Sequence, residues 1–209
     1  MNLYAWMTWN RILVNLSKTL ILHGGFKPQG REDEWDQEIK QFNQFLNAKG
    51  LQVCDVEGDG NCLFYALSEQ IGVDHKGVGD HNEFRLLVKQ QLESNIEYYQ
   101  KKCEGDINEH IRKVTQDGEW GDTLDIIAIS DALKWRIVVY MKPEKDEEGF
   151  FELRYDPEGC EPVKTVYILH SYKFKHFMST RPNQRYVGNY VKLEEGQFGR
   201  VYYAKHVIS

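Results

Sequence analysis

The feature that most constrains the fold of this chain is a change in hydrophobic period about two thirds of the way along the sequence. Before that point, apolar residues recur at helical intervals, which predicts helices over 33–48, 62–71, 80–99, 106–116 and 123–134, with a short extended segment at 51–56. After it, the period is that of strands, over 136–141, 150–155, 165–169 and 177–180. This order favours an α+β domain in which helices flank a central mixed or antiparallel sheet.

Chain length and turn residues suggest how the chain is divided. A chain of 209 residues is long enough for one domain with extensions. We expect an N-terminal extension over 1–30, which ends in glycines and a proline, and a main domain over 31–183. We expect 184–209 to form a C-terminal, β-rich extension packed on the same domain, with strands near 185–191 and 199–204.

Composition argues against several classes of protein. Acidic residues outnumber basic ones, 32 to 26, so nucleic acid is not an expected partner. No apolar run approaches the roughly 18 residues that a membrane span requires, and we expect no secretory signal because no basic segment precedes an apolar stretch. The four cysteines lack the spacing of a metal site or a disulfide scaffold, which indicates free thiols in a reducing compartment.

The segment DGNCLFYAL, residues 59–67, is the most informative for chemistry. A glycine-containing turn there delivers Cys62 to the first turn of an amphipathic helix. Backbone N–H groups at such a position stabilise a thiolate and can receive the oxyanion of a tetrahedral intermediate. The same pattern also fits a buried structural cysteine, because cysteine is among the most buried residue types.

A thiol nucleophile requires a base, and the sequence holds seven histidines. His176 is favoured because it opens a strand-like run after a polar loop, where an imidazole can be held rigidly and stay partly exposed. Spacing alone does not separate His176 from His170, which begins the same loop. Most of the other histidines, including His110 on a polar helix face, fit a solvated surface.

The segment 59–67 resembles the nucleophile motif of the OTU (ovarian tumour) family of cysteine deubiquitinases. Three further matches follow in the family's order. Residues 81–88 resemble the helix after the nucleophile, where an aromatic or aliphatic residue precedes an arginine. Residues 119–128 resemble its W-G-x-x-x-acid segment, and 166–177 resemble its ending, in which a strand and a loop lead to a histidine followed by an aromatic residue. The matches span about two thirds of the chain.

The resemblance implies a papain-like OTU fold and a thiol-dependent deubiquitinase, with 31–183 as the catalytic domain. Cys62 would be the nucleophile and His176 the general base, with a thioester intermediate and with Gly60 and Asn61 in the turn that forms the oxyanion hole. It implies no metal and no other cofactor. The expected partner is ubiquitin or a polyubiquitin chain, bound by a monomer. We expect a cytoplasmic location, which would be the cytosol of a host cell if the protein is an exported effector.

The third member of the catalytic group is the point where the chain departs from the family. Many relatives carry Asp or Asn two residues after the histidine, and here that residue is Met178, which cannot accept a useful hydrogen bond from imidazole. Asp59 is our first candidate, because it matches an aspartate often included in the family's site. A structural role as a turn former would also explain Asp59. Asp55 and Asn183 are the alternatives, and a dyad with a backbone or water partner is another.

Substrate contacts are harder to predict. The extended, glycine-rich tail of ubiquitin would require a narrow groove, for which Tyr172, Phe174 and Phe177 near the histidine are candidates. These residues could equally belong to the core. Trp120 also matches the family, and we interpret it as a structural residue that fills the base of the domain.

Three other functions fit the same residues. The protein could bind ubiquitin through an OTU-like fold with little or no cleavage, a reading that only Met178 and the unassigned acid favour. It could be a protease for another ubiquitin-like modifier, or a general thiol hydrolase. It could also be a structural interaction protein in which Cys62 is inert. Reactivity of Cys62 at neutral pH separates the last of these from an enzyme.

Overall fold

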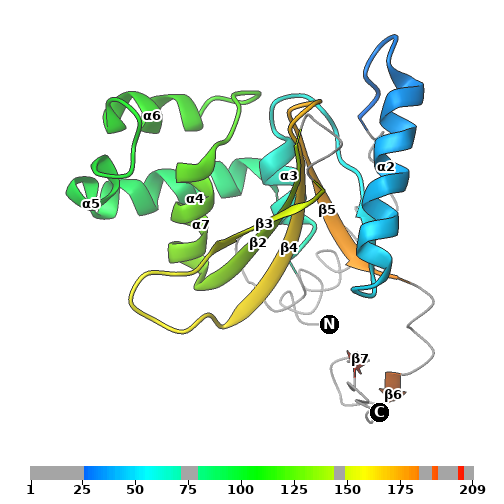
Figure 1. Ribbon diagram of the computed structural model, residues 1–209. Coiled ribbons are helices and arrows are strands. Elements are labelled where there is room, and N and C mark those ends of the chain that lie inside the picture. The colour runs from blue at the N-terminus through cyan, green and yellow to red at the C-terminus, as the bar shows by residue number, and fades with distance from the viewer. Residues whose placement is uncertain (1–25, 72–79, 144–148, 184–189, 193–201, 205–209) are drawn as a thin grey trace, which may run out of the picture.

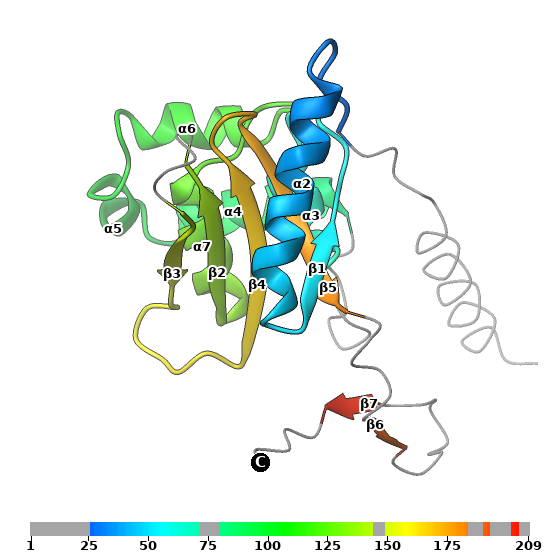
Figure 2. The same cartoon turned by 45° about the vertical axis from the view of Figure 1, so that its right-hand side comes forward.

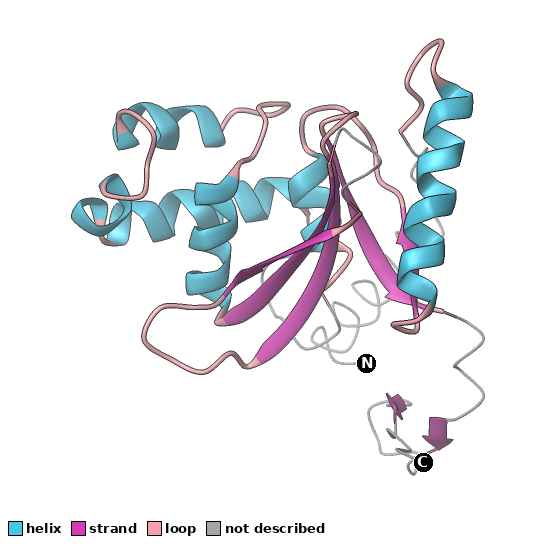
Figure 3. Cartoon of the chain, viewed as in Figure 1, coloured by secondary structure: helices cyan, strands magenta, loops and turns pink. Residues whose placement is uncertain are grey.

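The computed structural model describes residues 26–71, 80–143, 149–183, 190–192 and 202–204. The helices in these ranges are α2 (Glu32–Asn47), α3 (Cys62–Ser68), α4 (His81–Ser94), α5 (Ile96–Gln100), α6 (Ile107–Val114) and α7 (Thr123–Leu133). The strands are β1 (Leu51–Cys54), β2 (Trp135–Lys142), β3 (Phe151–Tyr155), β4 (Lys164–Ser171), β5 (His176–Pro182), β6 (Tyr190–Lys192) and β7 (Tyr202–Ala204). Figure 1 shows their arrangement, and Figure 3 separates helices from strands by colour.

A five-stranded mixed sheet forms the centre of the domain, with the strand order β1-β5-β4-β2-β3. Strands β2 and β4 are parallel, and the other neighbours in this sheet are antiparallel. Strand β1, which precedes α3 in the sequence, therefore lies beside β5, whose first residue is His176. This pairing brings the segment after β1 close to the histidine.

Helices cover both faces of the sheet and create two cores (Figure 2). Helix α2 packs on one face, and the other helices share a larger core with the opposite face. Along β2, Ile137 and Val139 belong to the larger core, whereas Val138 and Tyr140 belong to the α2 core. This alternation is the period-two pattern of a strand buried on both faces. The structure confirms the expected α+β class, a mixed sheet flanked by helices.

Aspartate side chains begin three of the helices. Asp80 accepts the backbone N–H of Glu83 at 3.0 Å, and Asp106 accepts that of Asn108 at 2.9 Å. Asp122 forms a reciprocal capping box with Asp125. Each carboxylate satisfies N–H groups that have no acceptor within the helix.

The prediction of one helix from Asp80 through Tyr99 is wrong. Helix α4 ends at Ser94, and Asn95 leaves helical geometry with φ −152° and ψ 70°. The Asn95 side chain then accepts the N–H of Tyr98 and caps the short helix α5. Asparagine side chains compete with helical hydrogen bonds in this way, so the apolar stripe continues while the helix breaks.

The two extensions fall largely outside the described residues. Residues 26–30 lead into α2, and the earlier part of the N-terminal extension is not described. In the C-terminal extension, β6 and β7 pair antiparallel with each other as a separate two-stranded sheet. The predicted packing of this extension on the main domain stays a prediction. Among the helices of the described residues, none combines the length and apolarity needed to cross a bilayer.

Candidate active site

Cys62 and His176 come together although they are 114 positions apart in the sequence. Cys62 is the first residue of α3 and His176 the first of β5. The Cys62 thiol is in side-chain hydrogen-bond contact with the His176 ring, and the N–H of Phe177 lies 3.5 Å from the Cys62 sulfur. Cys62 is only 8% exposed. The structure thus pairs the predicted nucleophile with the predicted base.

Asp55 supplies the carboxylate next to His176. The Oδ1 atom of Asp55 lies 2.9 Å from Nε2 of His176. A carboxylate only accepts, so this nitrogen carries the proton and Nδ1 is the atom left to face the thiol. Burial alone would lower the pKa of His176, but the hydrogen bonds to Asp55 and Cys62 outweigh it and raise that pKa above its ordinary value. The arrangement favours the protonated, imidazolium form of His176.

Asp59, the first candidate from the sequence, makes different contacts. Its carboxylate accepts the backbone N–H of Asn61 at 3.0 Å and the Tyr65 hydroxyl at 3.2 Å. It therefore shapes the turn, while the alternative candidate Asp55 is the one that contacts His176. Met178 is completely buried in the α2 core. The position where many relatives carry Asp or Asn is thus a packing position here.

The structure also distinguishes His176 from His170. The His170 ring packs against Phe177 with centroids 4.4 Å apart. Burial, and to a smaller extent the charge on His176, lower the pKa of His170 to about 4. His170 therefore stays neutral near pH 7, and it is His176 that has both a thiol and a carboxylate partner.

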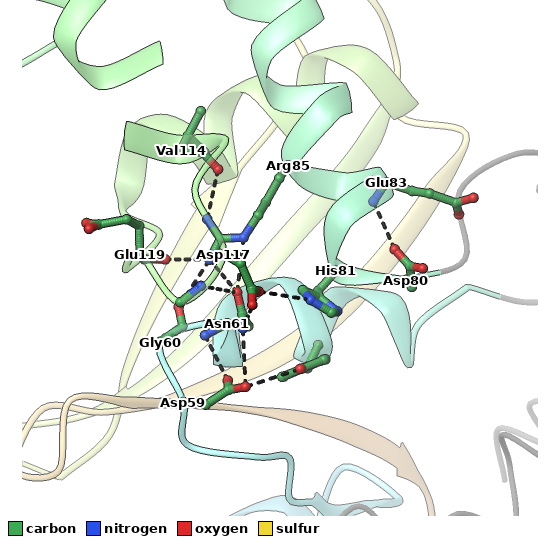
Figure 4. Close-up of polar contacts among 12 residues, drawn as sticks. Asp59, Gly60, Asn61, Asp80, His81, Glu83, Arg85, Val114, Asp117 and Glu119 are labelled. Carbon is green, nitrogen blue, oxygen red and sulfur yellow. Dashed lines mark hydrogen bonds and ion pairs between the residues drawn. The ribbon is translucent and has the colours of Figure 1, made fainter. Parts of the chain in front are cut away.

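Buried Arg85 holds the turn before Cys62 in place (Figure 4). This side chain is only 1% exposed and donates from Nε to Oδ1 of Asn61 at 3.0 Å. It also donates to the backbone carbonyls of Val114, at 2.8 Å, and of Glu119. One guanidinium on α4 thus connects the nucleophile turn to the loop between α6 and α7.

Asn61 is the centre of this network. Its Oδ1 accepts the N–H of Gly118 at 3.1 Å, and its Nδ2 donates to Asp117 at 3.0 Å. His81 lies 3.2 Å from the same oxygen of Asp117. Asn61 therefore joins the turn before Cys62 to the 115–122 loop. Figure 4 shows these side chains converging from the turn before α3, from α4 and from the 115–122 loop.

Gly60 allows the turn to approach that loop closely. Its φ is +87°, which lies in the left-handed region, and a Cβ there would lie 1.8 Å from the carbonyl oxygen of Gly118. A side chain at this position is excluded by both the backbone angle and the space.

The backbone N–H groups of the turn differ in what they can offer an oxyanion. The Asn61 N–H is already donated to Asp59. The Cys62 N–H belongs to the first residue of α3, so no carbonyl of the helix is placed to accept it. Among the groups expected from sequence, Gly60 and Asn61 mainly fix the turn, and the N–H of Cys62 itself becomes the best-placed donor.

The aromatic residues expected to line a groove have separate roles. Tyr172 is 55% exposed beside the histidine loop. Phe174 packs edge-on against Trp35, with centroids 5.1 Å apart, and Phe177 packs on His170. Only Tyr172 of the three is strongly exposed.

The structural interpretation of Trp120 is wrong. The side chain is 63% exposed, and its neighbour Gly121 lies against Leu63 and Phe64 of α3. Gly121, and not Trp120, makes the close contact with the core. The indole of Trp120 remains on the surface near the nucleophile turn.

A second polar cluster lies away from Cys62. His110 on α6 contacts Asp125 on α7 at 2.8 Å, and its other nitrogen lies 3.7 Å from Asp122. The hydrogen bond to Asp125 raises the pKa of His110. His110 is therefore an inter-helix contact, and the expectation of a solvated histidine is wrong. The three side chains could converge on a cation, but Asp122 and Asp125 already cap α7.

Comparison with known proteins places these residues in context. A family model described as "OTU-like cysteine protease" matches residues 57–177, which is more than half of the chain. The match contains Cys62 and His176 and begins after Asp55.

Curated relatives match a similar region. "OVARIAN TUMOR DOMAIN-containing deubiquitinating enzyme 10" from Arabidopsis thaliana is 38% identical over 108 residues, which are 52% of this chain and 30% of the relative. "Ubiquitin thioesterase otu2" from Schizosaccharomyces pombe is 24% identical over 119 residues, 50% of this chain and 37% of the relative. The chain spans about a third of the length of these relatives.

Solved structures share the fold. The OTU domain of OTUD1 superposes with a TM-score of 0.59 at 20% identity, covering 69% of this chain and 94% of that domain. An OTU deubiquitinase from Wolbachia pipientis, solved bound to ubiquitin, gives a TM-score of 0.53 at 12% identity and covers 65% of this chain and 98% of the other.

Proposed function

The chain belongs to the family of OTU-like cysteine proteases, and from this premise we propose that it is a deubiquitinase that cleaves isopeptide bonds at the C-terminus of ubiquitin. The observation that carries the proposal is the contact series from the Cys62 thiol through His176 to Asp55. The names of the curated relatives, a deubiquitinating enzyme and a ubiquitin thioesterase among them, support ubiquitin as the substrate.

In the first half of the reaction, the Cys62 thiolate attacks the carbonyl carbon of the isopeptide bond. The carbonyl oxygen becomes an oxyanion, to which the backbone N–H of Cys62 can donate. The C–N bond then breaks, and the His176 imidazolium gives its proton to the departing lysine amine. The products of this half are a free amine and a thioester between Cys62 and ubiquitin.

In the second half, neutral His176 accepts a proton from water as the water oxygen attacks the thioester carbonyl. The C–S bond breaks, ubiquitin leaves with a free carboxylate, and the thiolate is restored. Asp55 holds the His176 ring so that one nitrogen faces the sulfur throughout, and it stabilises the imidazolium of the first half. Asp55, and not Asp59, is our assignment for the third member of the catalytic group.

Two exposed aromatic side chains are the proposed contacts for the substrate tail. Trp120 stands on the loop that Arg85 joins to the nucleophile turn, and Tyr172 stands on the loop before His176. Trp120 thus belongs to the loop tied to the nucleophile turn, and Tyr172 belongs to the loop that leads to the histidine. A large aromatic surface on each loop suits an extended, glycine-rich tail, which has few side chains of its own to bind.

The direct test uses ubiquitin with a thiol-reactive electrophile in place of its C-terminal carboxylate. Wild type should gain the mass of one ubiquitin, and Cys62→Ala should gain none. His176→Gln should react much more slowly. Cys160→Ala is the matched control, because it removes an exposed thiol and should react like wild type.

Equivalent probes built on other ubiquitin-like modifiers complete this experiment. An adduct with one of those and none with ubiquitin would overturn the assigned substrate. If folded wild type forms no adduct with any probe, the proposed deubiquitinase function is wrong. Thermal melting of each variant shows whether a lost adduct reflects a lost fold.

A further inference from the structure

The His176 ring packs against two aromatic residues that precede the matched family region. Phe26 is stacked on it, with centroids 4.5 Å apart and an interplanar angle of 19°. Trp35, from the first turn of α2, meets it edge-on at 5.5 Å and 74°. Phe26 lies within the N-terminal extension expected from sequence, so the extension reaches the candidate active site.

Phe26 is held in position by contacts that do not involve His176. Its backbone N–H donates to the carbonyl of Val56 at 3.1 Å, which ties it to the segment between β1 and the nucleophile turn. Its ring lies directly on Gly58, where a Cβ would come within 2.1 Å of Cδ2 of Phe26. The absence of a side chain at residue 58 therefore makes room for this ring.

The beginning of α2 is also joined to the loop before His176. Lys173 forms an ion pair with Glu34 at 3.0 Å, and Arg31 lies over the Phe174 ring at 4.6 Å. Trp35 packs against the same Phe174 ring. These contacts fix the segment from Phe26 to Trp35 relative to the loop that delivers the histidine.

The polar and aromatic contacts of His176 restrict different movements of its ring. Asp55 and Cys62 contact its nitrogens, and so they fix directions within the ring plane. A stacked ring fixes the plane itself, because tilting the imidazole separates the two faces. The stacked ring also covers one face of the imidazole and limits the access of water to it.

We propose that Phe26 is a positioning residue for His176, and that the segment from Phe26 to Trp35 completes the catalytic machinery from outside the matched family region. The inference rests on the proposed role of His176 as the base. Phe26 carries no charge and exchanges no proton, so it acts by holding the imidazole in line with Cys62. The titratable groups that interact electrostatically with this imidazole are Asp55, Cys62 and His170.

The first experiment measures steady-state cleavage of ubiquitin carrying a fluorogenic amide at its C-terminus. Phe26→Ala should lower kcat about tenfold and change KM less than about twofold, as expected when an aromatic contact to the base is lost. Phe26→Tyr keeps the stacked face and should restore most of kcat. Phe151→Ala removes a phenylalanine that is 42% exposed on β3 and should change neither constant.

A second variant displaces Phe26 without changing it. Gly58→Ala places a methyl group where the Phe26 ring lies, and the φ of residue 58 is not in the left-handed region. Gly58→Ala should therefore lower kcat as Phe26→Ala does. In the double variant the two losses should not add, because both remove the same stacked contact. Fully additive losses would overturn the proposal.

A third measurement does not depend on ubiquitin. Alkylation of Cys62 by iodoacetamide at pH 6, followed by mass spectrometry of its peptide, reports how much thiolate the histidine maintains. Phe26→Ala should slow the alkylation of Cys62 several-fold. The alkylation rate of exposed Cys160, the internal reference, should stay unchanged. This difference should persist even if wild type cleaves no ubiquitin substrate, in which case the proposed function fails and the role of Phe26 stands.

Three further results would overturn the role of Phe26. A higher kcat/KM in Phe26→Ala would make it an autoinhibitory contact. A rise in KM alone would make it a substrate contact. Unchanged kcat and unchanged Cys62 alkylation in a folded Phe26→Ala variant would make the stacking incidental.

Discussion

The two sides of the candidate active site are held in place by different interactions. On the nucleophile side, buried Arg85 and Asn61 fix the turn before Cys62 through hydrogen bonds. On the histidine side, Phe26 and Trp35 pack on His176, and Asp55 is its carboxylate partner. The first side lies within the matched family region, whereas these three partners of the histidine all precede residue 57.

This difference indicates that the nucleophile turn is held rigidly, whereas the His176 ring can make small adjustments. A buried guanidinium with several acceptors permits little movement, because each broken contact leaves a polar group unsatisfied. Aromatic packing is less directional: it fixes the plane of the ring but tolerates small shifts within that plane. The turn can therefore keep its oxyanion donor fixed, while the imidazole adjusts as it exchanges protons with the sulfur, the amine and water.

Replacement of Arg85 should have the largest effect on stability. Arg85→Met leaves buried acceptors on Asn61, Val114 and Glu119, and should cost about 3–5 kcal/mol of unfolding free energy. Denaturant unfolding measures this cost. Arg112→Met, at an exposed position on α6, is the matched control and should stay within about 0.5 kcal/mol of wild type. Equal costs for the two variants would contradict the hydrogen-bonded description of the nucleophile side.

Gly60→Ala should act on the same side through the backbone. The left-handed angle alone costs about 1–2 kcal/mol, and the contact with the Gly118 carbonyl adds to it. Gly159→Ala, at φ +70° with no atom within 4 Å of the added Cβ, isolates the cost of the angle. We expect Gly60→Ala to exceed Gly159→Ala in destabilisation and to abolish probe labelling of Cys62, which Gly159→Ala retains.

The exposed aromatic residues should affect binding with little effect on stability. Trp120→Ala and Tyr172→Ala should each raise KM for a ubiquitin substrate several-fold, since aromatic residues often dominate binding energy. Their unfolding free energies should stay within about 0.5 kcal/mol of wild type. A large loss of stability in Trp120→Ala would restore the structural interpretation of this residue. An unchanged KM in both variants would show that neither residue contacts the substrate.

Much of the fold could be predicted from sequence because its signals are local. The change from helical to strand period lies within the segments themselves, and Asp80, Asp106 and Asp122 cap helices a few residues away. The break at Asn95 was missed because an apolar stripe continues across it. The pairing of β2 with β4 involves strands separated by β3, and no local pattern encodes it.

The candidate site likewise contains residues that local sequence predicts and residues that only the fold brings together. The Cys62 turn is contiguous in sequence, so its residue types could be interpreted directly. Asp55 and His176 are 121 positions apart, and spacing could not rank Asp55 above Asp59. Phe26 carried no signal beyond being an apolar residue before a helix. The exposure of Trp120 follows from the packing of Gly121 on α3, which only the three-dimensional arrangement reveals.

The most direct test of this account compares Asp55→Asn with Asp59→Asn in the pH dependence of kcat/KM. Asp55 raises the pKa of His176, so the imidazolium persists to higher pH and is lost as pH rises through that raised value. Asp55→Asn should move the alkaline limb of the profile to lower pH, by about one unit, and lower its maximum at least about tenfold. Asp59→Asn should leave the alkaline limb in place. A shifted limb in Asp59→Asn beside an unshifted one in Asp55→Asn would contradict the assignment of Asp55 to His176.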